Sequence, residues 1–284
     1  MWCDAINTSL GVLTWASSTY LGQSWWTVMS LVASLGNFYL STWEEYHTGI
    51  LYLGHFSGPV EGVLMLVAVH LTSGYFGPAI WTLRLEETVT AVDWNYNAQT
   101  RLAGALQLNH LLIVIGSLVL ILNIVTALVN VISVKINPTD YSSGKDRSIV
   151  KAMFGLSPFV IMCYLSYNWM CLWPDLVSDH LALVIPIVGL LFGYQVGLMI
   201  VAHVAKLSFP YFSLSVIGFL SLGNLYAYME NEGYLSNIQD HRSIVLGMLI
   251  LAILQYATFA LSVIRQICQF LDIGCLYIKH KKTN

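Results

Sequence analysis

Eight stretches of about 20 mostly apolar residues divide this chain, and they constrain its fold more than any other feature. They cover roughly residues 3–21, 25–43, 60–81, 110–134, 151–172, 181–205, 209–228 and 244–267. An α-helix of about 20 residues matches the ~30 Å hydrocarbon layer of a bilayer. The apolar residues are continuous instead of alternating, so the stretches predict helices and not barrel strands.

The charge content supports the same class. Hydrophobic residues make up 57% of the 284 positions and charged residues 10%, whereas soluble domains carry roughly 25% charge. So few charges cannot cover a water-facing surface. We therefore predict an all-α, polytopic transmembrane helix bundle in a lipid bilayer, with residues 1–284 as a single membrane domain. We expect no nucleic-acid partner.

The positions of the twelve Lys and Arg residues predict the orientation. With the first end in the cytosol, nine of them fall in cytosolic segments and only Arg84, Arg101 and Arg242 fall outside. Basic residues concentrate on the cytosolic side of membrane proteins. An even number of spans then places both termini in the cytosol.

Several polar and small residues recur at helical spacing inside the spans. Asn123 and Asn130 are seven residues apart, and Gln195 and His203 are eight apart. Hydrogen bonding between helices explains both pairs without catalysis. The stripe Gly189, Gly193 and Gly197 fits either a homodimer contact or close packing within one chain, and we favour the second interpretation.

An acidic and aromatic patch is predicted at the cytosolic face. It contains Asp4 at the mouth of the first span, the segment Trp43–Gly49 with Glu44, Glu45 and Tyr46, and Glu61 behind Pro59. An aromatic belt with a solvated loop explains most of this pattern. Glu44, His47 and His55 offer metal-binding side chains, but their spacing matches no strong ligand pattern.

Two sequence blocks resemble a known family. The block NFYLSTWEEYHTG at 37–49, continued by LYL at 51–53 and GPVEG at 58–62, is similar to fungal cholinephosphotransferases and ethanolaminephosphotransferases. These enzymes form part of the CDP-alcohol phosphatidyltransferase class I family. The segment CDAINT at 3–8 resembles the end of that family's catalytic motif, D-G-x2-A-R-x8-G-x3-D-x3-D.

The resemblance implies phospholipid biosynthesis. Phosphocholine or phosphoethanolamine would pass from CDP-choline or CDP-ethanolamine to diacylglycerol, releasing CMP. Magnesium, with manganese as an alternative, would be held by the acidic residues of the motif. Asp4 corresponds to the last of these and is the expected metal ligand and catalytic residue, while Glu44, Glu45, Tyr46 and Glu61 are candidates for binding substrate.

The same resemblance implies about ten spans, of which this chain matches the last eight. The preceding Asp of the motif would lie before Met1, and no Asp-Gly or Ala-Arg pair occurs in the chain. We therefore expect a domain that lacks the first two spans and most of the catalytic motif, and that lacks full activity alone. The alternative function is a non-catalytic membrane scaffold or a regulator of an intact paralogue. A secondary transporter is weaker, because the sequence has no evident inverted repeat.

The end of the chain predicts the compartment. Lys281 and Lys282, followed by Thr283 and Asn284, resemble a dilysine retrieval signal of the endoplasmic reticulum. Anchoring by basic residues on the cytosolic side explains them equally well. Either interpretation fits the endoplasmic reticulum membrane, with the Golgi as a second location.

Overall fold

The computed structural model describes residues 2–50, 59–84, 107–137, 148–234 and 241–275, and its helices account for nearly all of them. The α-helices are α1 (Trp2–Ser18), α2 (Trp25–Thr48), α3 (Pro59–Phe76), α6 (Leu108–Ile136), α7 (Ile149–Phe154), α8 (Ser157–Leu172), α9 (Asp175–Ser178), α10 (Leu181–Val204), α11 (Leu214–Asn231) and α12 (His241–Leu271), with a 3-10 helix η1 (Pro78–Thr82). These ranges contain no strand beyond an isolated bridge between Arg84 and Gln107. The all-α prediction is confirmed.

Each of the eight expected spans contains a helix. Four segments are both long and apolar enough to cross a membrane: Leu108–Ile136, Ile149–Leu172, Leu181–Val204 and His241–Leu271. The other helices at expected spans, α1, α2, α3 and α11, are shorter or more polar. The structure therefore supports a multi-pass membrane protein, while the number of eight spans stays a prediction.

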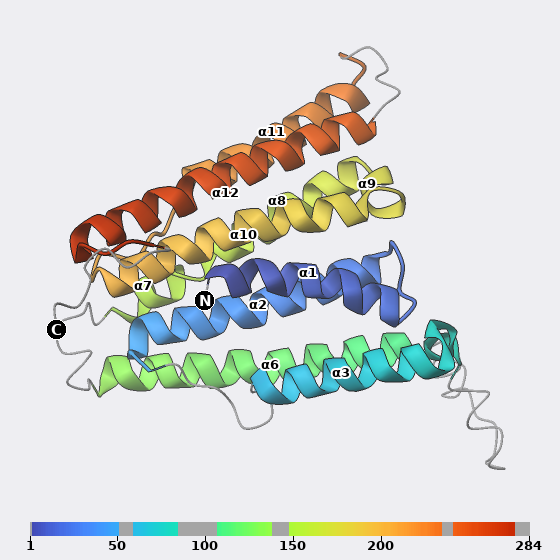
Figure 1. Ribbon diagram of the computed structural model, residues 1–284, viewed down its shortest axis with the longest axis horizontal. Helices are drawn as coiled ribbons and strands as arrows, with labels where there is room; N and C mark the ends of the chain where they lie inside the picture. The colour runs from blue at the N-terminus through green and yellow to red at the C-terminus, as the bar shows by residue number, and fades with distance from the viewer. Residues whose placement is uncertain (1, 51–58, 85–106, 138–147, 235–240, 276–284) are drawn as a thin grey trace, which may run out of the picture.

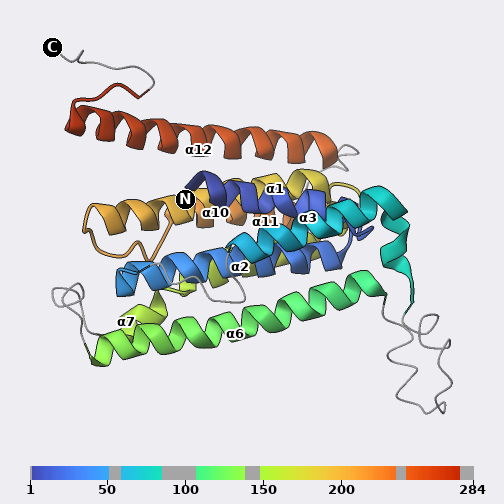
Figure 2. The same cartoon turned by 60° about the horizontal axis from the view of Figure 1, so that its bottom comes forward.

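The long helices lie side by side, and helices that follow one another along the chain run in opposite directions (Figures 1 and 2). Helices α2, α6, α10 and α12 all end at the side drawn on the left in Figure 1, and α1, α3, α8 and α11 run the other way. Helix α10 lies at the centre, where α1, α2 and α12 pack against it. About two thirds of its most apolar window is buried, compared with 11% for α6 and α12.

The seventh expected span begins later than predicted. Helix α11 starts at Leu214, and Phe209 and Pro210 lie in the connection that follows α10. Proline has no N–H to donate and disfavours a helical residue before it, so the helix forms only beyond it. The Ser213 side chain then accepts a hydrogen bond from the Val216 amide and caps α11.

The fifth expected span is interrupted. Helix α7 ends at Phe154 and α8 begins at Ser157, so that carbonyl groups of the intervening turn lie outside a regular helix. Two side chains of α2 bind them: the Tyr39 hydroxyl donates to the Gly155 carbonyl at 2.7 Å, and Trp43 Nε1 donates to the Ala152 carbonyl at 3.0 Å. These bonds satisfy backbone acceptors that would be costly to leave unpaired in lipid.

The glycine stripe of α10 faces α1 within the same chain. A Cβ atom added at Gly189 would collide with the Ser9 side chain, and one at Gly193 would meet Ile6 at 2.8 Å. The missing side chains let the two antiparallel helices approach closely. Packing within one chain, the favoured interpretation, is confirmed for Gly189 and Gly193.

Substituting Gly189→Ala should therefore destabilise the protein. Overpacking of this kind costs about 1–3 kcal/mol, so the unfolding midpoint in detergent should fall by several degrees. Gly218→Ala is the matched control, because a Cβ atom at that position of α11 has no neighbour within 4 Å. Thermal unfolding of both purified variants followed by tryptophan fluorescence measures the difference, and equal midpoints would contradict the assignment.

Candidate functional site

The C-terminal half of α2 concentrates polar side chains at the end of the bundle where α2, α6 and α10 finish (Figure 1). Glu44, His47 and Thr48 are all less than 9% exposed, although they are polar or charged. Such groups need hydrogen-bond partners when they leave water. The partners come from the helices on either side of α2.

Helix α6 supplies two of these partners at equal spacing. Asn123 Nδ2 donates to Asn37 Oδ1 at 2.8 Å, and Asn130 Nδ2 donates to Glu44 Oε1 at 2.7 Å. Both pairs join residues 86 positions apart, so α2 and α6 run parallel with matching seven-residue repeats. Interhelical hydrogen bonding, predicted for Asn123 and Asn130, is confirmed.

Helix α2 is also held by the end of α10 and by the connection that follows α10. The Tyr46 hydroxyl donates to the Leu207 carbonyl at 2.8 Å, and its ring lies edge-on to His203 with centroids 5.9 Å apart. One helical repeat earlier, Gln195 of α10 lies near the Tyr39 side chain, and its Nε2 atom is buried without a hydrogen-bond partner among the described residues. His203 thus contacts α2 through Tyr46, while the interhelical hydrogen bond of Gln195 stays a prediction.

His47 occupies an aromatic box. Its ring is edge-on to Trp43 and Tyr46, with centroids 5.5 and 5.1 Å apart, and stacks on Phe209 at 5.9 Å and 11°. Within the described ranges, no group of three or more His, Cys, Asp or Glu side chains could hold one metal ion. His55, the third member of the metal hypothesis, lies outside the described residues.

Asp4 lies in the first turn of α1, as predicted, and the register between α1 and α10 gives its depth along the bundle. The contacts of Ser9 with Gly189 and of Ile6 with Gly193 set the register of α1 against α10, and they place Asp4 level with Gln195. Gln195 is beside Tyr39, six residues before Glu45. At 1.5 Å per residue, Asp4 is about 9 Å further along the bundle axis than Glu45. Asp4 is an exposed residue.

Glu45 faces a different direction from its two neighbours. Successive helical residues are about 100° apart, so Glu44 pointing to α6 and Tyr46 pointing to the α10 side leave Glu45 between them. Trp43 contacts α7 on the opposite side of α2. The remaining neighbour of α2 is α1. Half-buried Glu45 therefore lies on the side of α2 that packs against α1 elsewhere along the helix.

The start of α3 is close to level with Asp4. Ser73 of α3 donates to the Ser18 carbonyl of the parallel helix α1, and both Pro59 and Asp4 lie fourteen residues earlier in their helices. Glu61 is therefore in the first turn of α3 beside α1, although its side chain lies outside the described part. The register therefore gives positions 4 and 61 a similar depth along the bundle, while Glu44 and Tyr46 bond within the protein.

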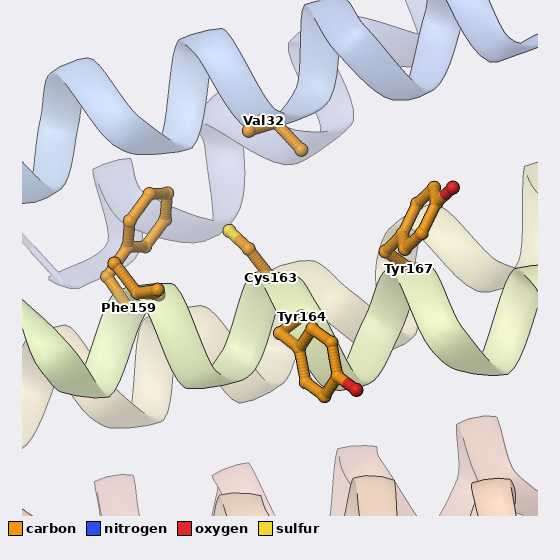
Figure 3. Close-up of a pocket in the computed structure, with 6 residues that line it drawn as sticks. Val32, Phe159, Cys163, Tyr164 and Tyr167 are labelled. Atoms are coloured by element: carbon orange, nitrogen blue, oxygen red, sulfur yellow. The ribbon is translucent and has the colours of Figure 1, made fainter.

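A cavity of about 410 Å³ lies elsewhere, between α2 and α8 (Figure 3). Its wall contains no carboxylate and consists of Val32, Phe159, Val160, Cys163, Tyr164 and Tyr167. In Figure 3 the Cys163 thiol points toward α2, and the tyrosine rings lie along α8. An apolar wall of this kind does not suit a nucleotide, so we place the candidate site at the end of α2.

Sequence reasoning did not identify Asn130 as the partner of Glu44. The signal was present, because Asn37 and Glu44 have the same seven-residue spacing as Asn123 and Asn130. Recognising it required knowing that α2 and α6 are parallel neighbours, although a third helix lies between them in sequence.

No family model matches the chain. Individual relatives do. Cholinephosphotransferase 1 of Saccharomyces cerevisiae is 34% identical over 98% of this chain and 69% of its own length. Choline/ethanolaminephosphotransferase 1 of the same yeast is 33% identical over 98% of the chain and 69% of its length.

An uncharacterised CDP-alcohol phosphatidyltransferase class-I family protein of Schizosaccharomyces pombe is 29% identical over 98% of the chain and 67% of its length. Each of these alignments covers 98% of this chain. Since a relative more than 30% identical is matched over nearly the whole chain, this protein belongs to the CDP-alcohol phosphatidyltransferase class-I family.

Proposed function

We propose that the protein is a transferase of phospholipid biosynthesis that moves phosphocholine or phosphoethanolamine from a CDP-alcohol to diacylglycerol and releases CMP. One observation carries the proposal: the two yeast relatives named for these activities match 98% of the chain at 34% and 33% identity. The resemblance of the 37–49 block was specific to the same enzymes.

The arrangement of the candidate site suits these substrates. Diacylglycerol resides in the bilayer and CDP-alcohols in water, so an enzyme that joins them needs a site open to both. Asp4 is exposed in the first turn of α1 and lies about 9 Å further along the bundle axis than Glu45, which is near the end of α2. A lipid hydroxyl entering sideways and a nucleotide entering from the end of the bundle can meet at this depth.

We assign different roles to the five candidate residues. Asp4, Glu45 and Glu61 are proposed to face substrate, because these acidic residues lie in the first or last turns of α1, α2 and α3. Glu44 and Tyr46 are proposed to hold α2, because Asn130 and the Leu207 carbonyl already bind their polar atoms. A substrate contact of Glu44 or Tyr46 stays a prediction.

Magnesium, or manganese in its place, also stays a prediction for this chain. A bound divalent cation would stabilise the negative charge that develops on the pyrophosphate in this reaction. Among the described residues no group of three or more His, Cys, Asp or Glu side chains could hold one metal ion, and one carboxylate such as Asp4 does not form a magnesium site. We therefore derive no step through the metal.

We also propose a location in the endoplasmic reticulum membrane, with the Golgi as a second location and both ends in the cytosol. The long helices alternate in direction, which agrees with cytosolic segments at one end of the bundle (Figure 1). The dilysine pair Lys281 and Lys282 lies outside the described residues. The single-domain assignment and a homodimer stay predictions.

Expression of the chain in microsomes from cells that lack these two phosphotransferase activities tests the proposed function. The assay supplies diacylglycerol, magnesium and labelled CDP-choline or CDP-ethanolamine, and we expect labelled phospholipid with at least one donor, at a rate below that of the full-length yeast relatives. Product no higher than in vector-only microsomes, with the protein inserted and folded, would refute the proposal. That outcome would favour the alternative, a non-catalytic scaffold or regulator of an intact paralogue.

Substitutions at Asp4 and Glu45 should reduce product formation. Asp4→Asn should lower the rate on the order of a hundredfold, as expected for a group that stabilises charge in the transition state. Glu45→Gln should lower it about tenfold through weaker substrate binding. Glu232 is exposed and lies at the C-terminal end of α11. The control variant Glu232→Gln should therefore keep the full rate. Equal rates in all three variants would remove Asp4 and Glu45 from the site.

A further inference from the structure

We infer that Asn130 is a positioning residue: by holding the Glu44 carboxylate, it fixes the rotation of the last turns of α2 and so presents Glu45 to the substrate. The inference rests on the proposed function and adds to it a residue of α6 that does not itself touch the substrate.

The first step is the bond itself. Glu44 is only 4% exposed, and its Oε1 atom accepts a hydrogen bond from Asn130 Nδ2 at 2.7 Å. A hydrogen bond to a carboxylate in a water-poor environment is stronger than one between neutral groups. Any rotation of α2 that removed Glu44 from Asn130 would leave a buried carboxylate without this donor, so the bond fixes the helix angle.

The second step is the position of Glu45 between two attachments. Asn130 holds the residue before it, and the Leu207 carbonyl holds the hydroxyl of Tyr46, the residue after it. Glu45 itself is half-buried on the side of α1. Because the attachments lie on different faces of α2, loss of one lets the last turns rotate about the other, and Glu45 moves with them.

The third step is a built-in comparison within α6. The bond from Asn123 to Asn37 joins the same two helices with the same donor atom at 2.8 Å. It lies seven residues further in, about 10 Å from the Glu44 bond at 1.5 Å per residue. Loss of this bond also removes one hydrogen bond between α2 and α6, but it does not release the end of α2.

Asn130→Leu and Asn123→Leu separate positioning from stability. Both variants should lower the unfolding midpoint. Only Asn130→Leu should raise the KM for the CDP-alcohol, by about tenfold, the ratio that corresponds to ~1.4 kcal/mol. KM for the CDP-alcohol is measured in microsomes with diacylglycerol in excess, and the amount of folded protein is normalised by fluorescence size-exclusion chromatography.

The double variant Glu44→Gln with Asn130→Asp provides the rescue. It exchanges amide and carboxylate between the two positions at unchanged side-chain lengths, so a hydrogen bond can form in the opposite direction. We expect Asn130→Asp alone to raise KM and the double variant to return it to within about threefold of the unsubstituted protein. Glu44→Gln alone keeps an acceptor oxygen for Asn130 Nδ2 and should change KM less. Asn130→Asp alone brings two carboxylates together, which repel each other.

The outcomes are distinct. Equal KM values in Asn130→Leu and Asn123→Leu, or no rescue in the double variant, would overturn the positioning role while leaving the proposed function intact. If Asn130→Leu does not fold, the rescue by the double variant decides the question. Absence of product from the unsubstituted protein would refute the proposed function instead.

Discussion

Polar groups inside a lipid-embedded bundle must find partners within the protein, and this requirement organises the structure around α2. Helix α2 contributes an amide, a carboxylate, two phenols and an indole, and partners on α6, on α7 and in the connections after α7 and α10 bind them. In water many of these bonds would contribute little to stability. In lipid the alternative is an unpaired polar group, so the same bonds determine which helices become neighbours and at which rotation.

The sequence predicted the fold class and the approximate limits of the helices. Both follow from hydrophobic runs that are much longer than the uncertainty in where each run begins and ends. The α10 stripe was also predictable, since small residues every four positions form one face whatever helix they meet. The start of α11 was not. Phe209 is as apolar as the span that follows it, and only the geometry of Pro210 and the cap at Ser213 move the helix start to Leu214.

The candidate site was predicted in composition and only partly in arrangement. The acidic block of α2 was visible in the sequence, but adjacent residues of a helix point to different neighbours, so Glu44, Glu45 and Tyr46 have separate surroundings. The depth of Asp4 could not be predicted either. It depends on the register between α1 and α10, which is set by contacts such as Ile6 with Gly193 and not by hydropathy.

The close approach of α1 and α10 has a consequence for related sequences. Two helix surfaces that touch at Ser9 and Gly189, and at Ile6 and Gly193, share a fixed volume between them. A bulkier residue on one surface fits only if its counterpart becomes smaller or the helices separate. Positions 6 and 193, and likewise 9 and 189, should therefore change in pairs across the family, with side-chain size conserved as a sum and not at either position alone.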